Sequence, residues 1–262
     1  MFAGFNIITK NQERFRGYHA SGLQIYKKYE RAISRNLSHY INPDGSLDQE
    51  LIEMEWFPEI DAHVFLSHSH SDLDFVISFA GWLYEEFGIK AFIDSTVWGS
   101  ADGLLKQIDE KYCVSSQYDD GSTETYSYQL RNKSTSNIHM ILYTALMKMI
   151  DNTECLMFIN TPSSLKWSDM ISTKQATASP WIYGEILASK LIRFKPLSEH
   201  RAYLMDSVME QFDESTDDLS FEYTLDLKHL RELDDDDLEY FEDHFRGTDP
   251  LNALNALYRW QK

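Results

Sequence analysis

The sequence predicts an α/β protein in which helices flank a parallel β-sheet. Short apolar runs with the length of buried strands alternate along the chain with longer segments whose apolar residues recur every three or four positions. Turn-forming residues separate these segments. Alternation of strands with amphipathic helices is typical of a doubly wound parallel sheet.

The individual elements follow from the spacing of apolar residues. Buried strands are predicted at residues 64–66, 90–94 and 155–159. Amphipathic helices are predicted at residues 75–87, 104–113 and 138–150. A further helix is predicted to begin at Ser179-Pro180, because serine is a favoured N-cap and proline fits the first helical position.

The segments around these elements divide the chain into three parts. Residues 20–40 and 47–54 have helical spacing, so residues 1–60 are predicted to be a helical N-terminal extension. The main domain is expected at residues 61–230, with a polar, turn-rich insertion at 115–137. Residues 231–262 are expected to form an acidic C-terminal helical segment with a solvated face.

Composition excludes several classes of function. The 262 residues include 24 Lys and Arg against 42 Asp and Glu, a formal net charge of −18. This balance argues against binding to nucleic acid or to an anionic membrane surface. The chain has 2 cysteines and no apolar run near the roughly 18 residues of a membrane span. A cytoplasmic protein is therefore expected.

Polar residues follow each predicted strand and should meet at one edge of the sheet, where such folds bind ligands. The first group, in HVFLSHSHSD, has the spacing of a metal site, with His68, His70 and Asp72 resembling a metallo-β-lactamase motif. Leu73 stands where that motif has a further histidine, and the alternation of strand and helix differs from that fold. No metal is therefore predicted. Ordinary loop hydrogen bonds and helix capping are the remaining alternative.

Four segments in order resemble a Toll/interleukin-1 receptor (TIR) domain, in particular the bacterial TIR enzymes of antiviral defence. They are VFLSHSHSDLDFV, GIKAFIDSTVWGSADGLLKQID, ECLMFINTPSSL and SPWIYGEILASKLI. The second resembles that family's second strand and mobile loop, and the last contains the pattern Trp181-x-x-x-Glu185. The resemblance covers about residues 60–230 and implies a flavodoxin-like fold.

The resemblance also implies an activity, cleavage of the nicotinamide–ribose bond of NAD⁺. In this interpretation NAD⁺ is a substrate and no cofactor is needed, in keeping with the absence of a Gly-x-Gly-x-x-Gly turn. Glu185 is the expected catalytic residue, since a carboxylate stabilises the positive charge that develops on the sugar. The expected substrate-binding residues are Trp181, Ser67, His68, Asp72, Asp94 and Trp98.

Further expectations concern partners. The family resemblance suggests a Thoeris-like enzyme that makes an ADP-ribose-derived signal for a separate effector in antiphage defence. It also suggests self-association on activation. The alternative is a non-enzymatic TIR scaffold that signals by self-assembly through the loop after the second strand, in which Trp98 lies. A scaffold has no need of the Trp181–Glu185 pair.

Overall fold

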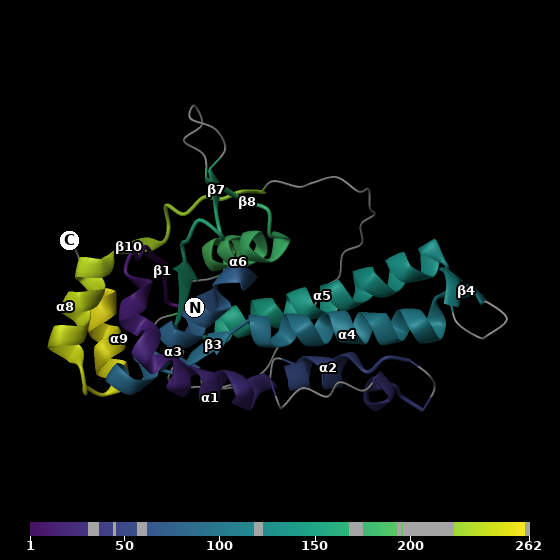
Figure 1. Ribbon diagram of the computed structural model, residues 1–262, viewed down its shortest axis with the longest axis horizontal. Helices are drawn as coiled ribbons and strands as arrows, with labels where there is room; N and C mark the ends of the chain where they lie inside the picture. The colour runs from purple at the N-terminus through teal and green to yellow at the C-terminus, as the bar shows by residue number, and fades with distance from the viewer. Residues whose placement is uncertain are drawn as a thin grey trace.

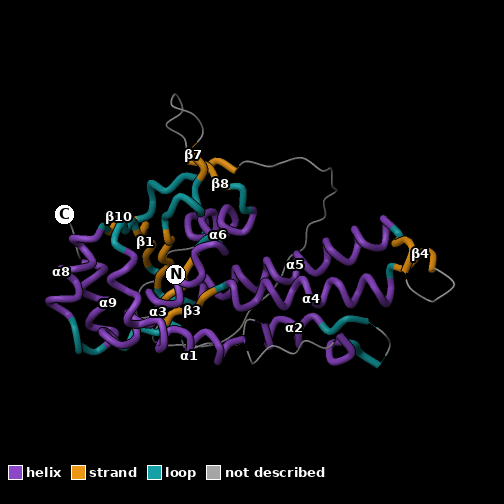
Figure 2. Tube along the Cα trace, in the orientation of Figure 1, coloured by secondary structure: helices purple, strands orange, loops and turns teal. Residues whose placement is uncertain are grey.

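The computed structural model describes residues 1–30, 37–43, 46–56, 62–117, 123–167, 175–192, 195 and 223–259. Its main sheet has five parallel strands in the order β10-β1-β6-β2-β3. The strands are β1 (Ala3–Ile7), β2 (Val64–Ser67), β3 (Ala91–Ile93), β6 (Cys155–Ile159) and β10 (Arg231–Leu233). With helices on both faces, this arrangement fits a flavodoxin-like fold and confirms the predicted α/β class (Figures 1 and 2).

The strand order places a topological switch point between β2 and β6. From β2 the chain crosses to β3 on one side, whereas the strands beyond β6 lie on the other side. Ser67, the last residue of β2, is in register with Phe158 of β6. In such sheets the carboxyl ends of the two strands at a switch point border the usual ligand-binding crevice.

Helices cover the two faces of the sheet. The α-helices are α1 (His19–Glu30), α2 (Gln49–Trp56), α3 (Leu73–Phe87), α4 (Ser95–Tyr112), α5 (Tyr128–Asn152), α6 (Pro180–Leu191), α8 (Asp235–Phe245) and α9 (Pro250–Arg259). The 3₁₀ helices are η1 (Gln12–Tyr18), η2 (Leu37–Tyr40) and η3 (His70–Asp72). Helices α3, α8 and α9 pack on one face, with α1 against α3. Helices α4, α5 and α6 pack on the other.

Side chains along each strand point alternately to the two faces of the sheet, so the strands separate two apolar cores. In β2, Val64 and Leu66 face the core beneath α3, and Phe65 faces the core beneath α5. Strand β6 alternates in the same way, with Met157 on the α3 side and Phe158 on the α5 side. A strand buried on both faces therefore needs apolar residues throughout, which is why these runs were recognisable in the sequence.

Helices α4 and α5 form a long antiparallel pair that extends away from the sheet (Figure 1). A hairpin of β4 (Val114–Gln117) and β5 (Thr123–Tyr126) joins them. The resemblance implied a mobile loop directly after the second strand, but α4 begins there, at Ser95. The expected insertion at 115–137 is also partly wrong, because residues 128–137 begin α5. Arg131 of α5 binds Asp109 of α4 at 2.8 Å, which fixes the two helices to each other.

The expectation that residues 1–60 form a helical extension was wrong in one respect. Helices α1 and α2 are present, but Ala3–Ile7 forms β1, which pairs with β6 on one side and β10 on the other. The physical reason is that Phe5 and Ile7 bury their side chains in the α3-side core. The N-terminal residues are therefore part of the sheet and not an addition to it.

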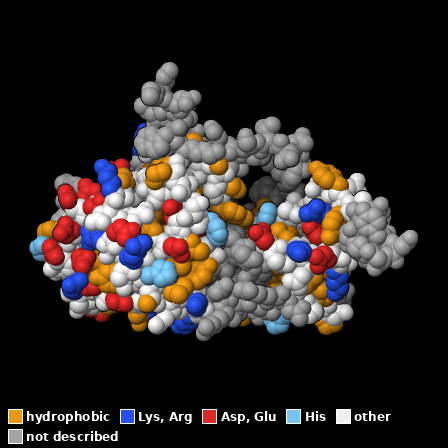
Figure 3. Space-filling model, in the orientation of Figure 1, with side chains coloured by type: hydrophobic (Ala, Val, Ile, Leu, Met, Phe, Trp, Pro, Cys, Tyr) orange, Lys and Arg blue, Asp and Glu red, His pale blue; other side chains and the backbone are white. Residues whose placement is uncertain are grey.

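The C-terminal segment is helical beyond residue 234, but Arg231–Leu233 forms β10 of the main sheet. Its acidic run is only partly solvated. Asp234 caps α8 in a capping box with Asp237, and Asp237 is buried. Exposed acidic side chains do gather over α8, which lies at the left of Figure 3 in the orientation of Figure 1.

A small antiparallel sheet lies next to the main one. It consists of β7 (Lys166–Trp167), β8 (Gln175–Thr177) and β9 (Tyr223–Thr224). Helix α6 follows β8 and begins as predicted: Ser179 accepts a hydrogen bond from the Ile182 N–H, and Pro180 occupies the first position. In the described ranges, no helix combines the length and the apolar character needed to cross a membrane.

Two glycines set the close approach of α1 and α3. A Cβ atom on Gly81 would collide with the carbonyl oxygen of Tyr18, and one on Gly22 with that of Ile77. We predict that Gly81→Ala lowers the free energy of unfolding by about 2 kcal/mol, because the obstructing atoms belong to the backbone. The matched control is Gly103→Ala in α4, where nothing lies within 4 Å of the added carbon.

Gly103→Ala is expected to raise stability by roughly 0.5–1 kcal/mol through helix propensity alone. Chemical denaturation of both variants measures the contrast. Equal effects in the two variants would contradict the assigned packing of α1 on α3.

Candidate functional site

The end of β2 meets helix α6 through one short hydrogen bond. The Ser67 hydroxyl donates to Glu185 Oε2 at 2.6 Å, and both side chains are buried with 0% exposure. The two residues are 118 positions apart in the sequence. Helix α6 presents Glu185 to the sheet because it packs its apolar residues Ile182 and Ile186 into the α5-side core.

Asp94 joins this pair from the end of β3. It is the N-cap residue of α4, is 4% exposed, and its side chain is hydrogen-bonded to the Glu185 carboxyl group. Glu185 Oε1 receives no N–H or O–H donor from the described residues. Two acceptor oxygens that face each other must hold a proton between them, since two bare carboxylates would repel.

His68 completes the cluster from the residue after Ser67. Its Nδ1 lies 3.2 Å from the Leu66 carbonyl oxygen and 3.0 Å from Asp94 Oδ1. Both neighbours are acceptors, so Nδ1 carries a hydrogen. The other ring nitrogen, Nε2, lies 2.7 Å from Ser95 Oγ. The four strand-end residues and Glu185 therefore form one buried polar cluster.

Burial and charge act on the titrating groups of this cluster. Burial, and then the adjacent Asp94 carboxylate, raise the pKa of Glu185 well above its ordinary value, whereas the hydrogen bond from Ser67 opposes that rise. Burial alone would lower the pKa of His68, but Asp94, the Leu66 carbonyl group and Asp72 together outweigh it, and the pKa is raised. Both shifts act in the direction of an ion pair between His68 and Asp94 beside a neutral Glu185.

The remaining predicted residues lie at or beyond the edge of this cluster. Asp72, in η3, accepts a hydrogen bond of 2.5 Å from the Thr161 hydroxyl, which links the loops after β2 and β6. Trp181 lies one turn before Glu185 and is half-buried, edge-to-face with His139 of α5 at 5.6 Å between ring centroids. Trp98 belongs to α4, but its side chain lies outside the described part of the structure.

Two residues in or beside the cluster, Ser95 and Tyr143, were not predicted as site residues from the sequence. Ser95 directly follows Asp94, and its place at the end of a strand was the only available signal. Tyr143 of α5 contacts the surface of α6 at Gly184, where its ring would meet an added Cβ atom. Burial, then Tyr183 and Glu185, raise the pKa of Tyr143. Its position off the apolar stripe of α5 gave no hint of this contact.

The geometry of the two histidines disfavours the metal alternative. His68 is buried and uses both ring nitrogens within the protein, whereas His70 is exposed. Among the residues that the structure describes, no three His, Cys, Asp or Glu side chains are grouped so as to hold a metal ion. Cys113 and Cys155 are both buried, as expected for packing residues.

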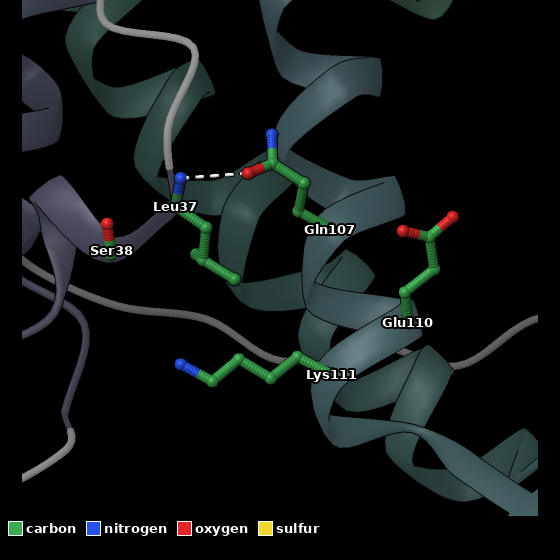
Figure 4. A pocket seen from close by; sticks show the side chains of 5 residues that line it. All are labelled: Leu37, Ser38, Gln107, Glu110 and Lys111. Atoms are coloured by element: carbon green, nitrogen blue, oxygen red, sulfur yellow. Dashed lines mark hydrogen bonds between the residues drawn. The ribbon is translucent and has the colours of Figure 1, made fainter.

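The cluster is closed in this structure, which the sequence did not predict. Glu185 has no exposed surface, so a ligand cannot reach its carboxyl group in this conformation. An open hollow does lie between η2 and the far half of α4, lined by Leu37, Ser38, Gln107, Glu110 and Lys111 (Figure 4). Gln107 follows Ser95 by twelve positions in α4, about 18 Å along the helix axis. None of the predicted site residues lines that hollow.

A protonated Glu185 makes stability depend on pH in a defined direction. Between the ordinary carboxyl pKa and the raised value, the folded state binds more protons than the unfolded chain, so the free energy of unfolding falls as pH rises. Glu185→Gln keeps the shape and removes the titration. We predict that this variant melts a few degrees above the wild type at about pH 8 and gains less at about pH 5.

Thermal denaturation at the two pH values measures the difference. A variant that loses the same stability at both would show that Glu185 is ionised in the folded protein.

No protein-family model, curated protein or solved structure matches this chain.

Proposed function

We propose that this protein is a TIR-type enzyme that cleaves the nicotinamide–ribose bond of NAD⁺, with Glu185 as the catalytic residue. One observation carries the proposal. The Ser67–Glu185 hydrogen bond joins two of the four segments that resemble TIR domains, and Asp94 of a third meets them beyond the ends of β2 and β3. The strand topology alone brings Ser67 and Asp94 to the same edge of the sheet. The support for the proposal is therefore the contact of Glu185, which comes from α6.

The chemistry needs one carboxylate at this position. When the bond between the ribose C1′ and the pyridinium nitrogen breaks, its electron pair stays on nicotinamide, which leaves as a neutral molecule. Positive charge then develops on the ribose, and an ionised Glu185 would stabilise it. Water, or another nucleophile in a cyclising reaction, adds to C1′ and loses a proton. The product is an ADP-ribose-derived nucleotide, which we propose as a signal to a separate effector in antiphage defence.

The closed cluster sets a condition on this activity. Glu185 is buried and hydrogen-bonded within the protein, so NAD⁺ must displace part of this arrangement to reach it. Asp94 and Ser95 belong to the start of α4, whose displacement would uncover both Glu185 and His68. We therefore expect the isolated chain to turn over NAD⁺ weakly. Self-association on activation is expected to supply the free energy that opening the cluster requires.

The burial of Glu185 is also the observation that favours a second candidate. A non-enzymatic scaffold would keep this carboxyl group as a structural link between β2 and α6. Its assembly surface would not be a loop after the second strand, because α4 begins there. An alternative surface is the far end of α5, where Tyr128 and Leu130 are exposed. The two candidates differ in whether NAD⁺ is consumed.

NAD⁺ turnover by the purified full chain, alone and in an activated assembled state, tests the proposal. We predict that Glu185→Gln lowers kcat by roughly 10²-fold or more, because a neutral amide cannot stabilise the developing cation. The matched control is Glu154→Gln. Glu154 is also buried but directly precedes β6, at the amino edge of the sheet, where it accepts a hydrogen bond from Tyr258 at 3.0 Å.

The control variant is expected to retain wild-type turnover. Turnover that survives Glu185→Gln would remove this residue from the mechanism. An assembled, signalling-competent wild type that consumes no NAD⁺ would favour the scaffold.

A further inference from the structure

The buried cluster is a continuous chain of hydrogen bonds and one ion pair from Ser95 through His68, Asp94 and Glu185 to Ser67. Every member is at most 5% exposed. The chain crosses from the end of β3 to the end of β2 and then to α6. It contains two carboxyl groups and one side chain that can become a cation, His68. The charge on each of these groups therefore depends on where the protons lie.

The directions of the hydrogen bonds decide which carboxyl group is charged. Ser67 donates to Glu185 Oε2, which leaves Oε1 as the oxygen that can carry a hydrogen. On the other side, His68 Nδ1 lies 3.0 Å from Asp94 Oδ1, the distance of an ion pair. If Glu185 donates, Asp94 accepts from it while the charged His68 ring balances the negative charge. With the proton on Asp94 instead, an ionised Glu185 would lie farther from the only cation of the cluster.

We propose that Asp94 is the positioning residue of this site: it carries the negative charge, accepts a hydrogen bond from the protonated Glu185 carboxyl group, and is balanced by His68. The catalytic meaning of this arrangement rests on the proposed function. A neutral Glu185 does not stabilise a developing cation, so the closed cluster is the resting state. Activation transfers the proton along the same hydrogen bond: the Glu185 O–H bond breaks, an Asp94 O–H bond forms, and the negative charge moves to Glu185.

Other titratable groups face this pair from each packed element. Tyr143 of α5 and Tyr183 of α6 lie on the Glu185 side, and Asp72 of η3 acts on His68. Burial raises the pKa of Tyr143, so its phenol stays neutral beside Glu185. Asp72 is an acid and favours the cationic form of His68. None of these groups supplies a second cation to Glu185, which leaves His68 as the charge that balances the cluster.

Infrared spectroscopy of the full chain tests this inference without NAD⁺. A protonated carboxyl group has a C=O band that is separate from those of carboxylates. The wild type is expected to show this band at neutral pH, and Glu185→Gln is expected to lose it. In Asp94→Asn the pH midpoint of the band should fall by about one unit or more, because the neighbouring negative charge is gone. In His68→Gln the midpoint should rise, because the balancing cation is gone.

The opposite signs of these two shifts keep the test valid if one variant fails to fold, which circular dichroism would reveal. Glu154→Gln, at the other edge of the sheet, should leave the band unchanged. Absence of the band in the wild type would overturn the inference. Its persistence in Glu185→Gln together with its loss in Asp94→Asn would do so as well, since Asp94 would then hold the proton.

The infrared band also distinguishes failure of this inference from failure of the proposed function. If the band behaves as expected but activated protein consumes no NAD⁺, only the enzymatic proposal fails. If both hold, Asp94→Asn should move the acidic limb of the kcat–pH profile to lower pH with little change in KM. A residue that merely bound substrate would instead raise KM without moving the profile.

Discussion

A carboxyl group removed entirely from water must either find partners or hold its proton, and Glu185 does both. Its position fixes much of what surrounds it. The hydrogen bond from Ser67 ties α6 to the end of β2, and the contact with Asp94 ties it to β3 and the start of α4. Breaking such a buried network costs more than a surface contact would, because each freed polar group would stay unsatisfied. The carboxyl ends of the two strands are therefore held together by polar contacts as well as by the apolar cores on both sides.

Those cores explain why much of the fold was predictable. The runs at residues 64–66, 91–93 and 155–159 are apolar at every position because both faces of these strands are covered. Helix α3 was also clear, since its apolar residues repeat at helical spacing. Once strands and helices were seen to alternate, the topology alone placed the residues after each strand at one edge. The meeting of Ser67, His68 and Asp94 follows from that rule.

What the sequence did not reveal depends on distant contacts. Strand β1 contains Gly4 and Asn6, which are poor strand formers, and it is stabilised by pairing with β6 and β10 far along the chain. The start of α4 includes Gly99 and Gly103, which are poor helix formers, so the sequence favoured a loop there. The complete burial of Glu185 is a tertiary property, and a helix pattern alone cannot distinguish it from a solvated face.

These features depend on a direct contact between Ser67, at the end of β2, and Glu185 of α6. A double-mutant cycle with Ser67→Ala and Glu185→Ala, followed by chemical denaturation, measures that interaction, because neither single variant keeps the hydrogen bond. We predict a coupling free energy of about 1 kcal/mol or more, because a short buried hydrogen bond is lost in either single variant. If the changes in the free energy of unfolding instead add to within roughly 0.3 kcal/mol, the two side chains do not meet.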